Sequence, residues 1–131
     1  MKKACRKLGI EEKVVFTGFL DRERRLELVA KARLMLYPSY IDAFPYAVLE
    51  SLYLGTPVVG YRIPALDIYY GKHPSVKLVD EGNISAFTVE ALNMLKKPDE
   101  FVEPPKIRSW REIMDEEVSL IEKTIGKLSG H

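Results

Sequence analysis

Short apolar runs alternate with longer amphipathic segments along the chain. Four of the runs predict β-strands, because they are brief, rich in β-branched or aromatic residues and bounded by Gly or Pro. They cover 13–19, 33–39, 57–61 and 76–79. The run 57–61 is almost purely apolar, which is typical of a strand buried on both faces of a parallel sheet.

The segments between and beside these runs predict helices. Their expected bounds are 22–32, 44–54, 85–97 and 109–128, and a further helix ends near Gly9. Helix-end signals support these bounds. The signals are Asp21 as an N-cap, Gly55 to Pro57 and Pro98 as stops, and Ser109 with Glu112 as a capping box. The longest irregular loop is expected at 62–75.

Strands that alternate with helices predict an α/β fold, a doubly wound Rossmann-like parallel sheet of about four strands flanked by helices. We expect 13–19 to pair directly with 33–39, because the helix between them is a sufficient right-handed crossover. The chain, 1–131, is expected to form a single domain, with 105–131 as a C-terminal helical extension after the Pro104-Pro105 linker.

Composition agrees with a folded domain and disfavours several classes. The 131 residues are 47% hydrophobic and 30% charged, and the net charge of +1 offers no basic footprint for nucleic acid. No stretch approaches the ~20 apolar residues of a membrane span.

The lone cysteine, Cys5, cannot form an internal disulfide, which favours a cytoplasmic setting. A peripheral membrane contact through Arg22, Arg24 and Arg25 stays open. No His and Cys spacing predicts a metal site, and no cofactor is expected.

The candidate chemistry lies between the strand 33–39 and the helix 44–54. Ligands of parallel sheets bind at the carboxyl ends of strands, and the free N–H groups of the next helix favour an anion. Asp42 precedes this helix and Glu50 lies about two turns into it. Two carboxylates beside a helix end suit a ligand with phosphates and several hydroxyls, such as a nucleotide-sugar. Taken singly, Asp42 could be an N-cap and Glu50 a solvated helix residue.

The order of residues around these two acids resembles a known family. Pro38-Ser39 is followed by Asp42-Ala43-Phe44-Pro45, Leu49-Glu50, Gly55 and Pro57-Val58-Val59. This series is similar to the Glu, seven residues, Glu stretch of the retaining glycosyltransferases with the GT-B fold, family GT4. The resemblance covers nearly the whole chain and implies the C-terminal donor-binding domain, N-terminally truncated.

The resemblance also implies roles for individual residues. Glu50 would bind the ribose hydroxyls of the nucleotide, and Asp42, the candidate catalytic residue, would face the transferred sugar. The other substrate-binding candidates are Ser39 and the main chain of Ala43, Phe44 and Tyr46. The chain departs from the family by carrying Asp rather than Glu at 42 and Ala rather than Gly at 43.

The implied reaction is transfer of a glycosyl unit from a UDP-, GDP- or ADP-sugar to an acceptor hydroxyl, with retention of configuration. The family's acceptor domain and the Arg–Lys pair that neutralises the diphosphate have no counterpart here, so the isolated chain is expected to be inactive. A non-catalytic nucleotide-binding or interaction module and a nucleotide-sugar 2-epimerase fragment are the alternatives. The missing acceptor domain is one expected partner, and a second copy at an exposed sheet edge is another.

Overall fold

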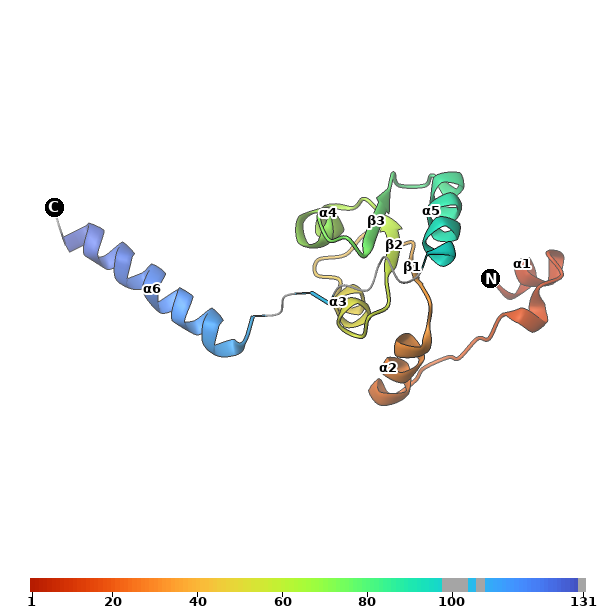
Figure 1. The fold of residues 1–131 in the computed structure, drawn as a ribbon, viewed down its shortest axis with the longest axis horizontal. Coiled ribbons are helices and arrows are strands. Elements are labelled where there is room, and N and C mark those ends of the chain that lie inside the picture. Colours follow the sequence, from red (N-terminus) through yellow and green to blue (C-terminus); the bar gives the residue numbers. More distant parts are fainter. Residues whose placement is uncertain (98–103, 106–107, 130–131) are drawn as a thin grey trace.

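The computed structural model describes residues 1–97, 104–105 and 108–129. In Figure 1 the sheet and the helices packed on it form a central body, while α1 and α6 stand apart from it. The elements follow in the order α1 (Lys2–Lys7), the 3-10 helix η1 (Glu11–Lys13), α2 (Arg22–Lys31), β1 (Met35–Tyr37), α3 (Tyr46–Tyr53), β2 (Val58–Tyr61), α4 (Pro64–Tyr70), β3 (Val76–Val79), α5 (Ile84–Lys96) and α6 (Trp110–Ser129).

The sheet is parallel and has the order β1-β2-β3. Val58 of β2 pairs with Met35 of β1 on one side and with Val76 of β3 on the other. All four residues of β2 are buried, as the apolar composition of 57–61 predicted. The parallel α/β architecture expected from the sequence is therefore confirmed for three of its four strands.

Helices cover both faces of the sheet, with α3 and α4 on one side and α5 on the other (Figure 1). On the first side, a Cβ at Gly60 would lie 3.0 Å from Leu66 Cδ1 and 3.3 Å from the main-chain oxygen of Tyr37. The bare glycine therefore lets α4 approach β2 closely. On the other side, the Tyr61 ring lies 5.2 Å from the Phe87 ring of α5, measured between centroids.

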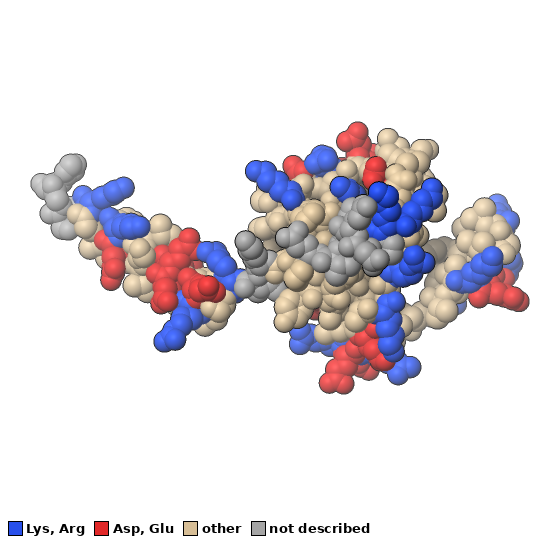
Figure 2. All heavy atoms as spheres, viewed as in Figure 1, with Lys and Arg blue, Asp and Glu red and all other residues tan. Residues whose placement is uncertain are grey.

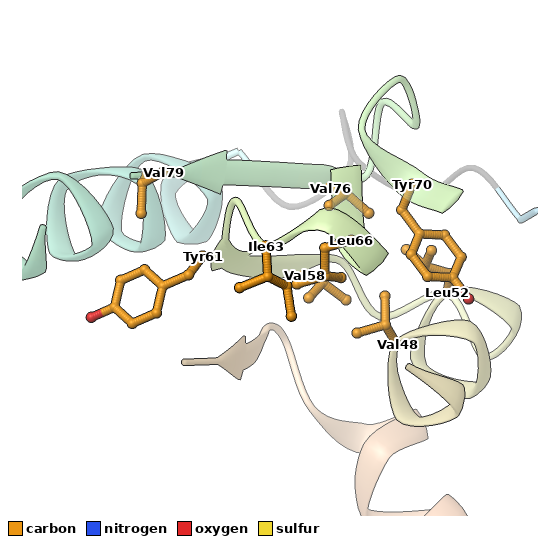
Figure 3. Close-up of a cluster of buried hydrophobic side chains, with 9 residues drawn as sticks. All are labelled: Val48, Leu52, Val58, Tyr61, Ile63, Leu66, Tyr70, Val76 and Val79. Carbon is orange, nitrogen blue, oxygen red and sulfur yellow. The ribbon is translucent and has the colours of Figure 1, made fainter. Parts of the chain in front are cut away.

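The core joins side chains of β2 and β3 to those of α3 and α4 (Figure 3). Its buried members are Val48 and Leu52 of α3, Val58 and Tyr61 of β2, Ile63 just before α4, Leu66 and Tyr70 within α4, and Val76 and Val79 of β3. Because the cluster draws on helices and strands alike, no single element could bury its apolar face alone.

The prediction of a strand at 13–19 is wrong. After η1 this segment continues as irregular backbone and pairs with no strand of the described residues. Its side chains Val15 and Phe19 are 83% and 99% exposed. The following helix, α2, packs against α3 and does not bring the segment to the free edge of β1. The Thr56 hydroxyl holds α2 in this position by donating to the main-chain oxygen of Val29 at 2.7 Å. Without a neighbouring strand, β-propensity alone forms no ladder.

The prediction that 62–75 is an irregular loop is also wrong, because this stretch contains α4. Pro64 occupies the first turn, where the missing N–H of proline costs nothing. Ala65, Leu66 and Tyr70 lie on one face of the helix and are buried. This apolar face was the signal in the sequence that would have predicted α4.

The helix-end signals at other positions are confirmed. The main-chain N–H of Arg24 donates to Asp21 Oδ1 at 2.8 Å, so Asp21 caps α2. At α6, Ser109 N–H donates to Glu112 Oε2 at 2.6 Å, and Glu112 N–H donates to Ser109 Oγ at 3.3 Å. Pro98 lies outside the described residues. Figure 2 shows acidic and basic side chains interspersed along α6.

The packing of α4 predicts a contrast between two of its residues. Leu66→Ala should lower the free energy of unfolding by about 2–5 kcal/mol, because it leaves a cavity beside β2. Ile68→Ala is the matched control, since Ile68 is 76% exposed and its change should stay within about 0.5 kcal/mol. Urea unfolding followed by circular dichroism measures both, and equal losses would show that the α4 interface does not contribute to stability as described.

Candidate functional site

The loop between β1 and α3 holds Asp42 at two points. The Tyr37 hydroxyl donates to Asp42 Oδ2, and the main-chain N–H of Phe44 donates to Asp42 Oδ1 at 3.1 Å. The N-cap of α3 is Pro45, which offers no side-chain cap. Asp42 therefore organises the loop before the helix rather than capping the helix itself, and its carboxylate stays half-buried at the carboxyl end of β1.

Other predicted binding residues lie in the same loop. The Ser39 hydroxyl donates to the main-chain oxygen of Ile41 at 2.9 Å. The N–H of Tyr46 donates to the main-chain oxygen of Phe44 at 2.9 Å, while that of Phe44 is bound to Asp42. Of the three N–H groups expected near the ligand, that of Ala43 is the one without an acceptor among the described residues. A ligand would compete with loop hydrogen bonds for the other two.

An aromatic cluster borders this loop. The Phe44 ring lies 4.6 Å from the Tyr46 ring and 4.8 Å from the Tyr69 ring of α4, measured between centroids. Both contacts have edge-to-face geometry, which aromatic pairs prefer. The cluster therefore ties the start of α3 to α4 beside Asp42.

Glu50 lies further along α3 and faces two arginines. Arg25 Nη2 of α2 lies 3.3 Å from the Glu50 carboxylate, and Arg22 Nε lies 4.0 Å from it. The Glu50 side chain is 25% exposed, so it is neither buried nor a freely solvated surface residue. The sequence did not indicate a contact between these arginines and Glu50. Their three-residue spacing on one helix face was the available signal, but it did not reveal which helix they would meet.

A pocket of about 470 Å³ opens beside the Arg22–Arg25–Glu50 cluster. Its volume is ordinary for a small-molecule site. The lining residues are Thr17, Gly18, Phe19, Leu20, Arg22 and Arg25. Sequence reasoning did not predict this pocket, because it assigned much of the lining to a strand. The Gly18 turn, at φ +64°, and the start of α2 form it instead.

Tyr70 places a hydroxyl in the interior near Asp42. The residue is 6% exposed, and its oxygen has no hydrogen-bond partner in the described part of the chain. The pKa of Tyr70 is raised to about 12. Burial is the largest cause, and the nearby Tyr69, Asp42 and Tyr46 raise it further. The phenol therefore stays protonated at neutral pH.

Residues 1–108 match the family model described as Glycosyl transferases group 1. The chain belongs to this family.

Named relatives agree with the group 1 assignment. The chain is 30% identical to the 2-deoxystreptamine N-acetyl-D-glucosaminyltransferase of Streptomyces fradiae over 67% of its own length and 21% of that protein. It is 25% identical to the MMP alpha-(1->4)-mannosyltransferase of Mycolicibacterium hassiacum over 98% of its own length and 33% of that protein. A solved sucrose-phosphate synthase from Thermosynechococcus elongatus shares the fold, with a TM-score of 0.76, 19% identity and coverage of 96% of this chain and 34% of that one.

The chain therefore spans a third or less of the length of these two relatives. Among the residues that the structure describes, no helix is both long and apolar enough to cross a membrane. The same residues contain no group of three or more His, Cys, Asp or Glu side chains that could hold a metal ion.

The buried Tyr70 phenol of this group 1 chain predicts a pH-dependent effect. Its folded pKa of about 12 exceeds the ordinary value near 10 of an unfolded chain, so its contribution to stability is intact below pH ~10 and is lost as pH rises towards 12. Tyr70→Phe removes this alkaline loss. We expect the difference in urea midpoint between Tyr70→Phe and wild type to grow in favour of the variant between pH 8 and pH 11.

A matched control deletes the hydroxyl of Tyr53, which is 65% exposed on α3. Tyr53→Phe should change the midpoint by less than Tyr70→Phe does at the higher pH. A Tyr70→Phe difference that is the same at both pH values would contradict the prediction.

Proposed function

We propose that this chain forms the nucleotide-sugar-binding part of a glycosyltransferase of the GT-B type that transfers a glycosyl unit with retention. The observation that carries the proposal is the position of two acids, Asp42 and Glu50, in the segment formed by the loop after β1 and the helix α3. Asp42 lies at the carboxyl end of β1, and Glu50 lies about one turn into α3 beside the 470 Å³ pocket. Membership of the group 1 family and the names of the relatives support a donor that is a nucleotide-sugar.

Glu50 and the pocket are proposed to bind the nucleoside. A carboxylate offers about four lone-pair sites, so Glu50 can keep its contact with Arg25 and still accept hydrogen bonds from two ribose hydroxyls. The pocket beside it has the volume for a base and ribose. Arg22 and Arg25 on the pocket wall would attract the negatively charged diphosphate towards the cleft.

Asp42 is proposed to face the transferred sugar. In the reaction, the bond between the anomeric carbon and the diphosphate oxygen breaks, and a bond from that carbon to the acceptor oxygen forms. The acceptor hydroxyl passes its proton to the departing diphosphate. Positive charge develops on the sugar ring as the nucleoside diphosphate leaves. A carboxylate held beside the ring by two internal donors stabilises this charge without having to reorganise.

The names of the relatives favour transfer over the alternatives. Those reported above are named for transfer of a sugar to an acceptor. Neither a nucleotide-sugar 2-epimerase nor a non-catalytic module has an observation of this kind in its support.

The assignment of the two acids predicts a difference in nucleotide affinity. In the full-length protein, Glu50→Ala should weaken binding of the nucleoside diphosphate by roughly 10- to 100-fold, because a charge-assisted hydrogen bond contributes about 1.5–3 kcal/mol. Asp42→Ala should weaken it less, since Asp42 faces the sugar. Calorimetric titration with UDP, GDP and ADP measures both effects and identifies the base.

Glu27→Gln supplies the control for this titration. Glu27 is an exposed α2 residue that pairs with Lys31, and its change should leave nucleotide affinity within about twofold. Equal affinities of wild type and Glu50→Ala would rule out the ribose role.

The isolated 131-residue chain should not turn over any nucleotide-sugar. It spans a third or less of the two relatives, and electrostatic stabilisation of the leaving diphosphate, usually the largest catalytic contribution, would rest on Arg22, Arg25 and a helix end alone. Release of nucleoside diphosphate from UDP-, GDP- and ADP-sugars is the measurement. A rate above that of buffer would contradict this expectation.

A further inference from the structure

Tyr37 lies at the last position of β1 and its hydroxyl reaches the acid that follows five residues later. It donates to Asp42 Oδ2, while the main-chain N–H of Phe44 donates to the other carboxylate oxygen. One donor on the strand and one on the loop therefore hold the two oxygens of the Asp42 carboxylate. The carboxylate is half-buried at the start of the loop, and each of its oxygens accepts one hydrogen bond.

The donor stands on a rigid element. Tyr37 pairs with Gly60 of the central strand, and its main-chain oxygen lies against the face of Gly60 that α4 covers. A side chain anchored on a paired strand holds a functional group more accurately than one on a free loop. Asp42 and its second donor, the Phe44 N–H, both lie on the loop, so the Tyr37 hydroxyl is the donor that links the carboxylate to the sheet.

We propose that Tyr37 is a positioning residue for Asp42, holding the carboxylate so that its remaining lone pairs face the transferred sugar. The inference rests on the proposed function. Each carboxylate oxygen has two lone pairs, so the two internal donors leave one on each oxygen for the ligand. The Tyr37 hydroxyl contacts the carboxylate of the short Asp side chain at 42 directly.

The first experiment is a double-mutant cycle in the full-length enzyme with Tyr37→Phe, Asp42→Asn and the double variant. Tyr37→Phe should lower kcat by roughly 10-fold or more, because the hydrogen bond from the Tyr37 hydroxyl to the Asp42 carboxylate is lost. Its Kd for the nucleoside diphosphate should stay within about twofold, since Glu50 and the pocket are untouched. The double variant should be no slower than Asp42→Asn. Losses that multiply would overturn the proposal, as would a Tyr37→Phe enzyme with wild-type kcat.

Tyr53→Phe is the matched control, because it removes one phenolic oxygen from an exposed position of α3. Its kcat and nucleotide Kd should equal those of the wild type. A loss of kcat equal to that of Tyr37→Phe would mean that the effect reports general disturbance, which would also overturn the positioning role.

A second experiment does not depend on activity. Burial raises the pKa of Tyr37, and the hydrogen bond and negative charge of Asp42 raise it further, while a hydrogen bond with Ser39 lowers it. Asp42→Asn in the full-length protein should therefore lower the pKa of Tyr37, measured by NMR on tyrosine labelled at Cζ. An unchanged Tyr37 pKa would show that the two side chains are not in contact.

The two experiments separate the positioning role from the proposed function. If the full-length protein transfers sugar from none of the three classes of nucleotide-sugar, the proposed function fails. In that case a Tyr37 pKa that responds to Asp42→Asn still supports the Tyr37–Asp42 contact, and the sugar-facing role is overturned. If transfer occurs and the cycle is additive, the proposed function stands and the positioning role is overturned.

Discussion

Complete burial of the central strand governs the arrangement of this domain. All four residues of β2 are buried, and a parallel strand of this kind requires cover on both faces. The helices α3 and α4 cover one face and α5 covers the other (Figure 1). Gly60 makes the first packing possible, since a side chain there would meet Leu66 and the main chain of Tyr37. The position of α4 and the end of β1 are therefore set by the same close contact.

This packing also brings the two acids of the candidate site to their positions. With α3 held on the sheet, the preceding loop lies at the carboxyl end of β1, where Tyr37 can reach Asp42. Thr56 continues the chain of contacts, because its hydroxyl donates to Val29 and its main-chain oxygen accepts from Ser51 at 2.9 Å. These bonds fix α2 against α3, and the arginines of α2 then meet Glu50.

The contacts of Glu50 and those of Asp42 contribute differently to the structure. The Arg25 side chain is 49% exposed, so its ion pair with Glu50 adds little to folding stability and acts mainly on orientation. The contacts of Asp42 are less exposed and include one main-chain donor, so they also define the loop. Glu50 is thus held by partly exposed ion pairs, whereas Asp42 is held by two part-buried hydrogen bonds.

The sequence alone determined the elements whose signals are local. Apolar runs placed β2 and β3, cap residues such as Asp21 and Ser109 placed helix starts, and the spacing of Asp42 and Glu50 indicated the candidate site. Local signals suffice there because burial and capping act within a few residues.

Tertiary structure decided the rest. The segment 13–19 has the composition of a strand but pairs with no other segment that the structure describes. A ladder requires a partner that its own residues cannot specify. The contacts of Arg25 with Glu50 and of Tyr37 with Asp42 likewise join elements whose relative placement follows from packing on the sheet. Sequence pattern records which faces are apolar, whereas the partner of each face is set by the free energy of the whole assembled core.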